Sequence, residues 1–231
     1  MTGVGSRETG VRVGLLGGTF DPIHEGHVAA ALAAQQALGL DEVTLVPSRQ
    51  PPHRPEQPYA AAADRLAMAT LVAREHAGWT VSEVEIRRDG PSYTFDTLTD
   101  LQKRGLTPFQ IFFITGADAF AEIASWWRYP ALLDLAHFVV VARPGGLTLE
   151  ALGKRLPDLA GRMIPVGQFV PDSRLPTPDS RTRILLLETA TPNVSSTEIR
   201  RRAQEGVPLT GMVSEAVAAY IEAHRLYRSE K

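Results

Sequence analysis

Cysteine is absent from this 231-residue sequence. The absence excludes disulfide bonds, thiolate metal sites and a thiol nucleophile, and it fits a reducing compartment. Long apolar runs are missing as well, since none approaches the roughly 20 residues that a helix needs to span a bilayer. The start of the chain, residues 1–10, is polar and has no apolar signal-peptide core, so we interpret it as a disordered leader on a cytoplasmic protein.

An excess of charge of one sign is also lacking, because 24 Lys and Arg residues are balanced by 26 Asp and Glu residues. We therefore expect no nucleic-acid partner and no membrane partner. There is no Gly-x-x-x-x-Gly-Lys-Ser/Thr loop, so the chain is not a P-loop protein. The glycine pair at residues 3–5 lacks the third glycine of a dinucleotide fingerprint and precedes the first expected strand rather than following it.

What the sequence does contain is a regular alternation of short apolar runs and helix-like segments. Strands are expected at residues 11–16, 43–46, 80–86, 110–115, 138–142 and 184–187. Helices are expected at residues 28–38, 61–76, 94–104 and 213–226. This alternation predicts an α/β, Rossmann-like, doubly wound parallel sheet of five or six strands with helices on both faces. Ligands of such sheets bind beyond the carboxyl ends of the strands, where the strand order switches.

The length suits one domain with an elaboration. We expect residues 11–231 to form that domain, with a small C-terminal helical portion at 191–231. The stretch 146–183 is less regular and contains several prolines, so we interpret it as an insertion or flap.

A glycine-rich turn with two histidines, residues 17–27, follows the first expected strand. It reads Gly-Gly-Thr-Phe-Asp-Pro-Ile-His-Glu-Gly-His. The glycines permit a close approach of the backbone to a ligand, and a helix beginning near Gly26 offers free N–H groups and a dipole to an anion. His24 and His27 can both donate to that anion. A lone histidine pair is more often structural, and a metal site would need a third ligand that nothing nearby supplies; the glycines favour the anion site.

A second segment with phosphate-binding character is residues 191–200, a loop that leads into a helix. Its Ser-Ser-Thr-Glu run has the spacing of a capping box. The hydroxyls of Ser196 and Thr197 can hold phosphate oxygens, and Arg200 adds a fork of donors one turn along. Taken alone, the segment is better explained as an ordinary capped helix with solvated arginines at 200–202. Paired with the histidine turn, it favours a phosphate site.

Together these two segments resemble the nucleotidyltransferase superfamily that carries a His-x-Gly-His signature and a C-terminal Ser-Ser/Thr-Thr-x-Ile-Arg motif. The long form of the first segment looks like the bacterial nicotinate mononucleotide adenylyltransferase branch. Further matching segments are Pro-Ser-Arg-Gln-Pro-Pro-His-Arg at 47–54, Pro-Ser-Tyr-Thr at 91–94, Gly-Ala-Asp at 116–118, Trp-Trp at 126–127, and Tyr-Ile and Leu-Tyr in the last helix. The resemblance covers residues 13–143 and 191–227.

The sequence departs from that branch in three places. Arg54 stands where the loop usually has lysine, Trp127 stands where tyrosine is usual, and the stretch 146–183 is longer than in compact bacterial members. No role is carried over to that stretch. His24 argues against the phosphopantetheine adenylyltransferases, which tend to have threonine at this point.

The resemblance implies transfer of the adenylyl group of ATP to nicotinate mononucleotide, which gives nicotinate adenine dinucleotide and pyrophosphate. It implies Mg²⁺ as cofactor, held mainly by phosphate and water rather than by protein ligands. The implied catalytic residues are His24, His27 and Arg200. The implied ATP-binding residues are Gly17, Gly18, Thr19, Phe20, His24, Gly26, His27, Gly116, Asp118, Ser196, Thr197 and Arg200. The implied mononucleotide-binding residues are His53, Arg54, Tyr93, Thr94, Trp126 and Trp127.

Structural alternatives remain for the acceptor side. The tryptophans can be core or interface residues, Thr94 can belong to a plain helix start, and His53 and Arg54 can be solvated. For the whole protein, the alternatives are a related transferase that prefers nicotinamide mononucleotide, another phosphorylated acceptor or CTP, and a nucleotide-binding sensor without turnover. The presence of both phosphate-binding segments speaks against the sensor.

Two further expectations concern the stretch 146–183 and the assembly. The prolines of that stretch, with Arg174, Arg181 and Arg183, predict a flap over the ATP site. The sequence leaves open whether the protein is a homo-oligomer.

Overall fold

The computed structural model describes residues 10–51, 57–143, 145–169 and 181–228. The strands among them form one sheet in the order β3-β2-β1-β4-β5-β7-β6, and every neighbouring pair is parallel. The strands are β1 Val13–Gly18, β2 Glu42–Pro47, β3 Trp79–Val81, β4 Ile111–Gly116, β5 His137–Ala142, β6 Met163–Pro165 and β7 Ile184–Glu188. The predicted α/β class is confirmed, and the sheet has seven strands rather than the expected five or six.

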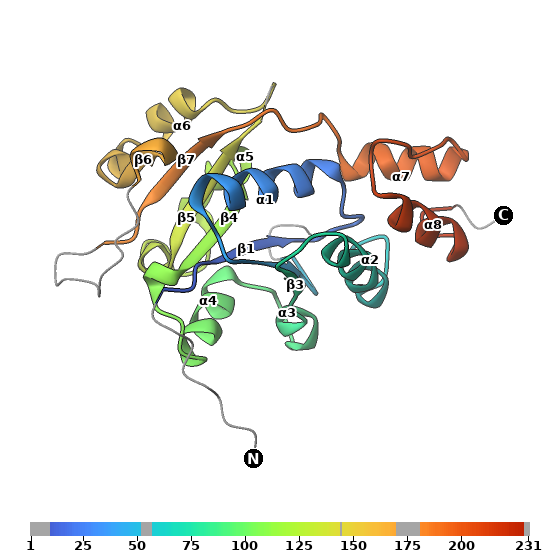
Figure 1. Ribbon diagram of the computed structural model, residues 1–231, viewed down its shortest axis with the longest axis horizontal. Helices are drawn as coiled ribbons and strands as arrows, with labels where there is room; N and C mark the ends of the chain where they lie inside the picture. The colour runs from blue at the N-terminus through green and yellow to red at the C-terminus, as the bar shows by residue number, and fades with distance from the viewer. Residues whose placement is uncertain (1–9, 52–56, 144, 170–180, 229–231) are drawn as a thin grey trace, which may run out of the picture.

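Helices connect the strands and cover the sheet on both faces (Figure 1). The α-helices are α1 Glu25–Leu38, α2 Ala62–Arg74, α3 Val84–Arg87, α4 Thr94–Lys103, α5 Ala117–Phe120, α6 Leu149–Arg155, α7 Ser196–Glu205 and α8 Glu215–Ala223. The 3-10 turns are η1 Pro108–Gln110, η2 Ile123–Ser125, η3 Ala131–Asp134, η4 Pro157–Arg162 and η5 Val166–Gln168. Across the described part of the chain, no helix combines the length and the apolar character needed to cross a membrane.

The central strands bury both of their faces, and their side chains alternate between two cores. Along β4, Phe112 and Ile114 join a core that also contains apolar residues of α1, α2, α7 and α8. Ile111 and Phe113 point the other way, into a core shared with residues of α4, α5, η3 and α6. A strand covered on both faces reads as a continuous apolar run, which is why the sequence pattern located β4 and β5 well.

Helix α1 lies across one face of the sheet and leads away from the glycine-rich turn (Figure 1). Its buried residues, Val28, Ala31, Ala34 and Leu38, follow helical spacing, and the first three have small or medium-sized side chains. Gly39 ends the helix in the left-handed conformation at φ 59°. This is the C-terminal glycine that the sequence predicts.

The expected strand 80–86 is wrong beyond its second residue. β3 ends at Val81, and α3 Val84–Arg87 follows. The last ladder-like bond is Ser82 N–H to the carbonyl of Leu45 at 2.9 Å. Further pairing along β2 would use Pro47, which has no N–H to donate, so the chain turns away from the sheet although its side chains alternate in polarity.

The stretch 146–183 is more regular than expected where the structure describes it. It contains α6, η4, β6 and η5, and β6 adds to the edge of the sheet by pairing with β7. Residues 170–180, with Arg174, lie outside the described residues.

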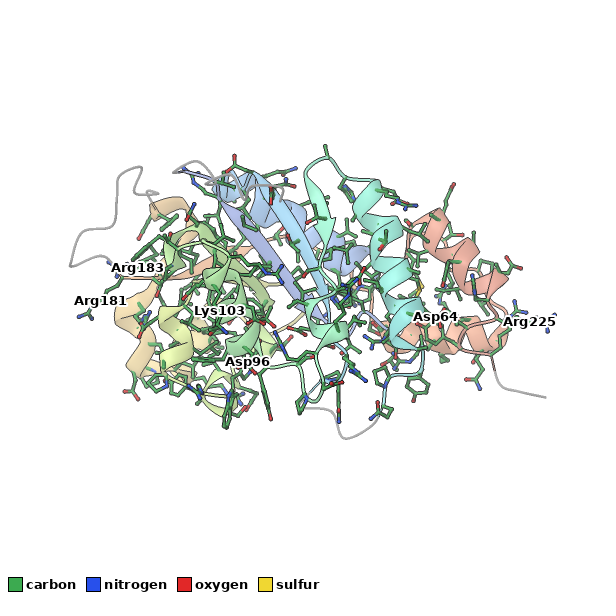
Figure 2. The ribbon with its side chains drawn as sticks, turned by 90° about the horizontal axis from the view of Figure 1, so that it is seen from below. Asp64, Asp96, Lys103, Arg181, Arg183 and Arg225 are labelled. Atoms are coloured by element: carbon green, nitrogen blue, oxygen red, sulfur yellow. The ribbon has the colours of Figure 1, made fainter. Side chains whose placement is uncertain are left out.

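The two ends of the stretch 146–183 lie in different places, since Leu147 near its start lines the main cavity and donates to Asp118, whereas the residues that flank 170–180 lie near the amino end of β5. Phe169 and the backbone N–H of Arg183 both contact His137, at the amino end of β5. Figure 2 shows Arg181 and Arg183 at the end of the molecule opposite Arg225 and the C-terminal helices. The proline-rich part of the predicted flap lies outside the described residues, so the flap over the ATP site stays a prediction.

Candidate active site

The main cavity opens where the strand order switches, between β1 and β4. It has a volume of about 550 Å³ and is lined by the carboxyl ends of β1, β4 and β5 and by the starts of α1, α4, α5 and α7. The chain continues from β1 to β2 on one side of β1, whereas β4 and β5 lie on the other side. The loops after β1 and β4 therefore lead in opposite directions and leave a crevice between them. A cavity of this size suits a nucleotide-sized ligand.

The histidine turn forms one wall of this cavity. The backbone N–H of His24 donates to Nδ1 of His27 at 3.3 Å, and the two rings stack with centroids 3.8 Å apart. Because Nδ1 of His27 accepts, its neutral form carries the proton on Nε2. A Cβ atom at Gly26 would lie 3.1 Å from Cε1 and Nδ1 of His24, so only glycine leaves the His24 ring undisturbed in this place.

His24 is an uncharged, incompletely satisfied group at neutral pH. Burial, and then the positive charge of Arg143, lower its pKa to about 4. Its Nδ1 atom is buried and has no hydrogen-bond partner within the described residues. An orphaned polar atom on a cavity wall points to a ligand that completes its hydrogen bonding, and the N-terminus of the adjacent helix α1 favours an anion there.

Asp21 holds the turn to distant parts of the chain. Its buried carboxylate accepts the backbone N–H groups of Tyr59 and Ala60 at 2.8 and 3.0 Å. It also accepts the hydroxyl of Tyr227 at 2.9 Å. Burial and the adjacent Asp21 raise the pKa of the Tyr227 hydroxyl, which therefore remains a donor. Three donors leave the carboxylate little freedom, so the turn is fixed in orientation.

Helix α7 docks its first turn against the histidine turn. Ser195 caps the helix by accepting the N–H of Glu198 at 3.2 Å, as expected. The hydroxyl of Ser196 donates to the carbonyl of Pro22 at 3.0 Å, and Arg200 donates to the carbonyl of Asp21 at 2.7 Å. The two predicted phosphate-binding segments are therefore directly bonded to each other.

The three arginines of α7 have different environments. Arg200 turns toward the cavity, contacts the hydroxyl of Thr197 at 3.2 Å and lies over the ring of Tyr59 at 4.4 Å. Arg201 and Arg202 instead pair with Glu198 on the surface, and their hydrogen bonds lower the pKa of that carboxylate to about 2. The solvated-arginine alternative thus holds for two of the three residues.

Asp118 and Arg143 line the cavity opposite the histidines. Their side chains are each about half exposed and 3.4 Å apart, and Asp118 also accepts the N–H of Leu147 at 3.2 Å. Arg143 was not among the predicted site residues. Its place directly after β5, at the same edge as the two predicted segments, is the signal that would have found it.

The other end of the cavity is lined by Thr94 and Trp126. An adjoining cavity of about 80 Å³ also includes Tyr93 and Trp127. Trp126 meets Phe113 edge-on with centroids 6.1 Å apart, whereas Trp127 is 50% exposed and stacks on Tyr93 at 5.4 Å. Core packing therefore accounts for one contact of Trp126, but it does not account for the exposed ring of Trp127.

Two buried charged residues at or beside the cavity, Glu85 and Arg65, were missed from the sequence. Glu85 lines the cavity, accepts the hydroxyl of Thr97 at 2.7 Å, and has its pKa raised by burial. Arg65 on α2 is 1% exposed and donates to four backbone carbonyls. An arginine within the apolar row of a helix, in line with Met68, Ala69 and Val72, was the available signal.

The structure brings nearly all predicted site residues together. Every predicted ATP-binding residue lines the main cavity: Gly17, Gly18, Thr19, Phe20, His24, Gly26, His27, Gly116, Asp118, Ser196, Thr197 and Arg200. Of the predicted mononucleotide-binding residues, Tyr93, Thr94, Trp126 and Trp127 line one or both cavities, and His53 and Arg54 lie outside the described residues.

A doubly wound sheet with the two predicted phosphate-binding segments at its switch point is the arrangement of a nucleotidyltransferase. The model of the cytidylyltransferase-like family matches residues 15–202 of the chain. A nicotinic acid mononucleotide adenylyltransferase from Plasmodium falciparum, complexed with NaAD, superposes with a TM-score of 0.68 and 17% identity over 94% of this chain and 97% of that chain. At that identity the likeness shows a shared fold.

Sequence relatives narrow the assignment. A probable nicotinate-nucleotide adenylyltransferase of Acidothermus cellulolyticus is 42% identical over 223 residues, 94% of each chain. A relative of the same name from Roseiflexus is 40% identical over 94% of this chain and 98% of that protein. The chain therefore belongs to the cytidylyltransferase-like family and, within it, to the nicotinate-nucleotide adenylyltransferases.

Proposed function

We propose that this protein transfers the adenylyl group of ATP to nicotinate mononucleotide and releases pyrophosphate. The observation that carries the proposal is that His24 and His27 on one side, and Thr197 and Arg200 on the other, line a single cavity that continues to Thr94 and Trp126. The first four residues supply a place for a triphosphate. The last two supply a flat apolar wall and a helix start for a small acidic ring.

The reaction forms a bond between a 5′-phosphate oxygen of the mononucleotide and the α-phosphorus of ATP. It breaks the bond between that phosphorus and the oxygen that bridges to the β-phosphate, and pyrophosphate leaves with the electron pair. Both reactants are anions, so the protein must hold them in line and neutralise the charge of the transition state. No covalent intermediate with the protein is needed.

In this proposal the two histidines act on the phosphates nearest the reacting centre. His27 donates from Nε2 to the α-phosphate, and His24 donates as a neutral imidazole, consistent with its pKa of about 4. Free N–H groups at the start of α1 add to the stabilisation of the charge. Thr197 and Arg200 hold the β- and γ-phosphates from the start of α7, and Asp118 accepts a ribose hydroxyl.

At the acceptor end, Trp126 stacks on the pyridine ring. The carboxylate of the ring is received by backbone N–H groups at Thr94 and Trp127. Thr94 is the first residue of α4, and N–H groups in the first turn of a helix have no intrahelical acceptor. A carboxylate is therefore stabilised at this point by both hydrogen bonding and the helix dipole.

Magnesium fits this site as a companion of the triphosphate. Among the described residues there is no group of three or more His, Cys, Asp or Glu side chains that could hold a metal ion. The ion would be held by phosphate oxygens and water, as Mg²⁺ commonly is, and when bound it supplies neutralisation of phosphate charge. The alignment of the reactants remains the task of the side chains named above.

The test is the release of pyrophosphate by the purified protein with acid and amide mononucleotides, each with ATP and with CTP. The proposal expects the highest kcat/KM with nicotinate mononucleotide and ATP. A clear preference for nicotinamide mononucleotide would contradict the acceptor, and a preference for CTP would contradict the donor.

A further inference from the structure

Arg65 is a charged side chain enclosed within the fold. It occupies the apolar row of α2 and is 1% exposed. Burial lowers the pKa of its guanidinium, and the nearby Asp21 partly opposes that effect. The hydrogen bonds that it donates within the described residues all end on backbone carbonyl oxygens.

These carbonyls belong to separate loops on either side of the reaction cavity. Nη1 donates to Thr19 and to Ser48, at 2.6 Å each. Nη2 donates to Arg49 at 3.2 Å, and Nε donates to Ala60 at 3.2 Å. One planar group thus joins the loop after β1 to the loop after β2.

The two loops face different reactants in the proposed reaction. Thr19 belongs to the glycine-rich turn at the triphosphate end. The loop after β2 is bonded to the acceptor end, because Arg49 N–H donates to Oγ of Ser92 at 3.0 Å and Ser92 N–H donates to the carbonyl of Gln50 at 3.0 Å. Ser92 lies two residues before α4.

Stability alone does not explain a charge in this position. Removing a guanidinium from water carries a large desolvation cost, and apolar residues that fill a buried ionic site often stabilise a fold at least as well. The planar fork of arginine, however, can meet several carbonyls in a fixed geometry that lysine cannot reproduce.

We propose that Arg65 is a positioning residue for the group transfer, which sets the separation between the ATP-binding loop and the acceptor-binding loop. The inference rests on the proposed function for the identity of the two reactants. Arg65 touches neither of them. Because misalignment by about 1 Å can cost about 100-fold in rate while each reactant still binds, its loss lowers kcat more than it raises either KM.

Arg162 provides a matched control at the opposite edge of the sheet. Its Nη2 donates to the carbonyl of Leu133 at 2.7 Å and to Oγ1 of Thr182 at 2.6 Å, near the amino ends of the strands. Arg162 is less buried than Arg65, with 22% of its side chain exposed, and it also pairs with Asp134 at 2.9 Å. Arg162→Met and Arg162→Lys therefore remove several partly buried contacts of an arginine without touching the loops of the cavity.

The experiment compares Arg65→Met and Arg65→Lys with the two Arg162 variants, and measures Tm, kcat and the KM of each substrate. We expect Arg65→Met to lower kcat by about 10- to 100-fold with smaller changes in KM. Arg65→Lys should recover part of kcat, because one ammonium can reach Thr19 and Ser48 but not all four carbonyls. The Arg162 variants should keep kcat even where Tm falls.

Unchanged kcat in the Arg65 variants, or an equal fall in kcat in both pairs, would overturn the inference. If Arg65→Met does not fold, Arg65→Lys decides by the same criterion.

A second readout is independent of turnover. The N–H of Ser48 donates to the carbonyl of Gly18 at 2.9 Å, across the two loops. Its hydrogen exchange should quicken in the Arg65 variants and not in the Arg162 variants, and equal exchange would contradict the inference. If the wild-type protein does not use nicotinate mononucleotide, the proposed function fails while this readout still decides the role of Arg65.

Discussion

The imidazole rings of His24 and His27 lie stacked 3.8 Å apart, on the wall of a cavity that Arg200 reaches from the other side. Nδ1 of His27 accepts the backbone N–H of His24, so the backbone of one histidine orients the ring of the other. A stacked pair of this kind cannot carry two charges at low cost. His24 is therefore expected to stay neutral beside His27, in line with its pKa of about 4.

His27→Ala removes the donor nearest the reacting phosphate. We expect kcat to fall by about 10²- to 10³-fold, the usual cost of losing one transition-state donor. The fold should stay intact, because His27 is only partly buried. Steady-state kinetics and a thermal melt check this. His76→Ala is the control, because the ring of His76 packs at a tilt against Trp79 and does not line the cavity. Full activity of His27→Ala would refute the catalytic role.

Gly26→Ala should separate stability from function. The new Cβ would lie 3.1 Å from the His24 ring, so the ring must shift and nucleotide binding should weaken. Alanine is the better helix former, but Gly26 lies in the first turn of α1, where the gain is smaller than the about 1 kcal/mol of a helix interior. This gain opposes the cost of shifting His24, so Tm should change little. In Gly153→Ala, also within a helix, a Cβ meets nothing within 4 Å. That variant should gain stability without losing activity, and an equal loss in both would contradict the argument.

Arg143→Gln should raise the KM for ATP by about tenfold, the effect of losing one charged hydrogen bond. It should also raise the pKa of His24, because the charge of Arg143 contributes to lowering it. Nucleotide titration and histidine NMR measure the two effects. Arg87→Gln, which breaks an exposed pair with Glu83, should change neither. A pKa of His24 that does not move would contradict the assigned cause.

Trp126→Ala should raise the KM for the mononucleotide by about 3- to 10-fold, the range expected for one lost aromatic contact. The KM for ATP should change less, because Trp126 lies at the far end of the cavity from Arg200. Trp127→Phe keeps an aromatic ring for stacking on Tyr93 and should be close to wild type. Equal effects of Trp126→Ala on both KM values would argue for a purely structural role.

Stability should fall as the pH is lowered from about 6.5 to about 4. His24 and His137 are buried, and their pKa values are lowered to about 4, so the unfolded chain takes up protons in this window that the folded protein does not. Each histidine can contribute up to about 3 kcal/mol to the free energy of unfolding. This contribution is fully present above pH 6.5 and is lost as the pH falls toward 4.

His137→Asn isolates one half of this effect. The Asn side chain keeps an oxygen acceptor for the N–H of Arg183, which Nδ1 of His137 accepts at 2.9 Å, but it does not titrate. Urea unfolding at several pH values should therefore show a shallower fall in stability for the variant than for the wild type. Parallel curves would refute the assignment.

Much of the fold followed from local pattern. The strands β1, β2, β4, β5 and β7 could be predicted because each is a short apolar run, and in the first four a glycine or proline stands at or just after the carboxyl end. The prediction failed at residues 82–86, where alternating polarity looked like a strand but Pro47 on the neighbouring strand leaves no donor. It also missed β6, a short edge strand without a strong apolar signal.

The candidate site likewise has parts that local sequence predicts and parts that it does not. The sequence by itself determined the glycine-rich histidine turn, the capped start of α7 and the aromatic residues after β4, because these depend on backbone conformation and spacing within a few residues. Only the tertiary structure decided that the hydroxyl of Ser196 meets the carbonyl of Pro22, 174 positions away. It likewise decided that Arg200 alone of its run faces the cavity, and that Arg65 joins two loops. Hydrogen bonds between distant segments depend on how the sheet brings its carboxyl edges together, and no local pattern encodes that arrangement.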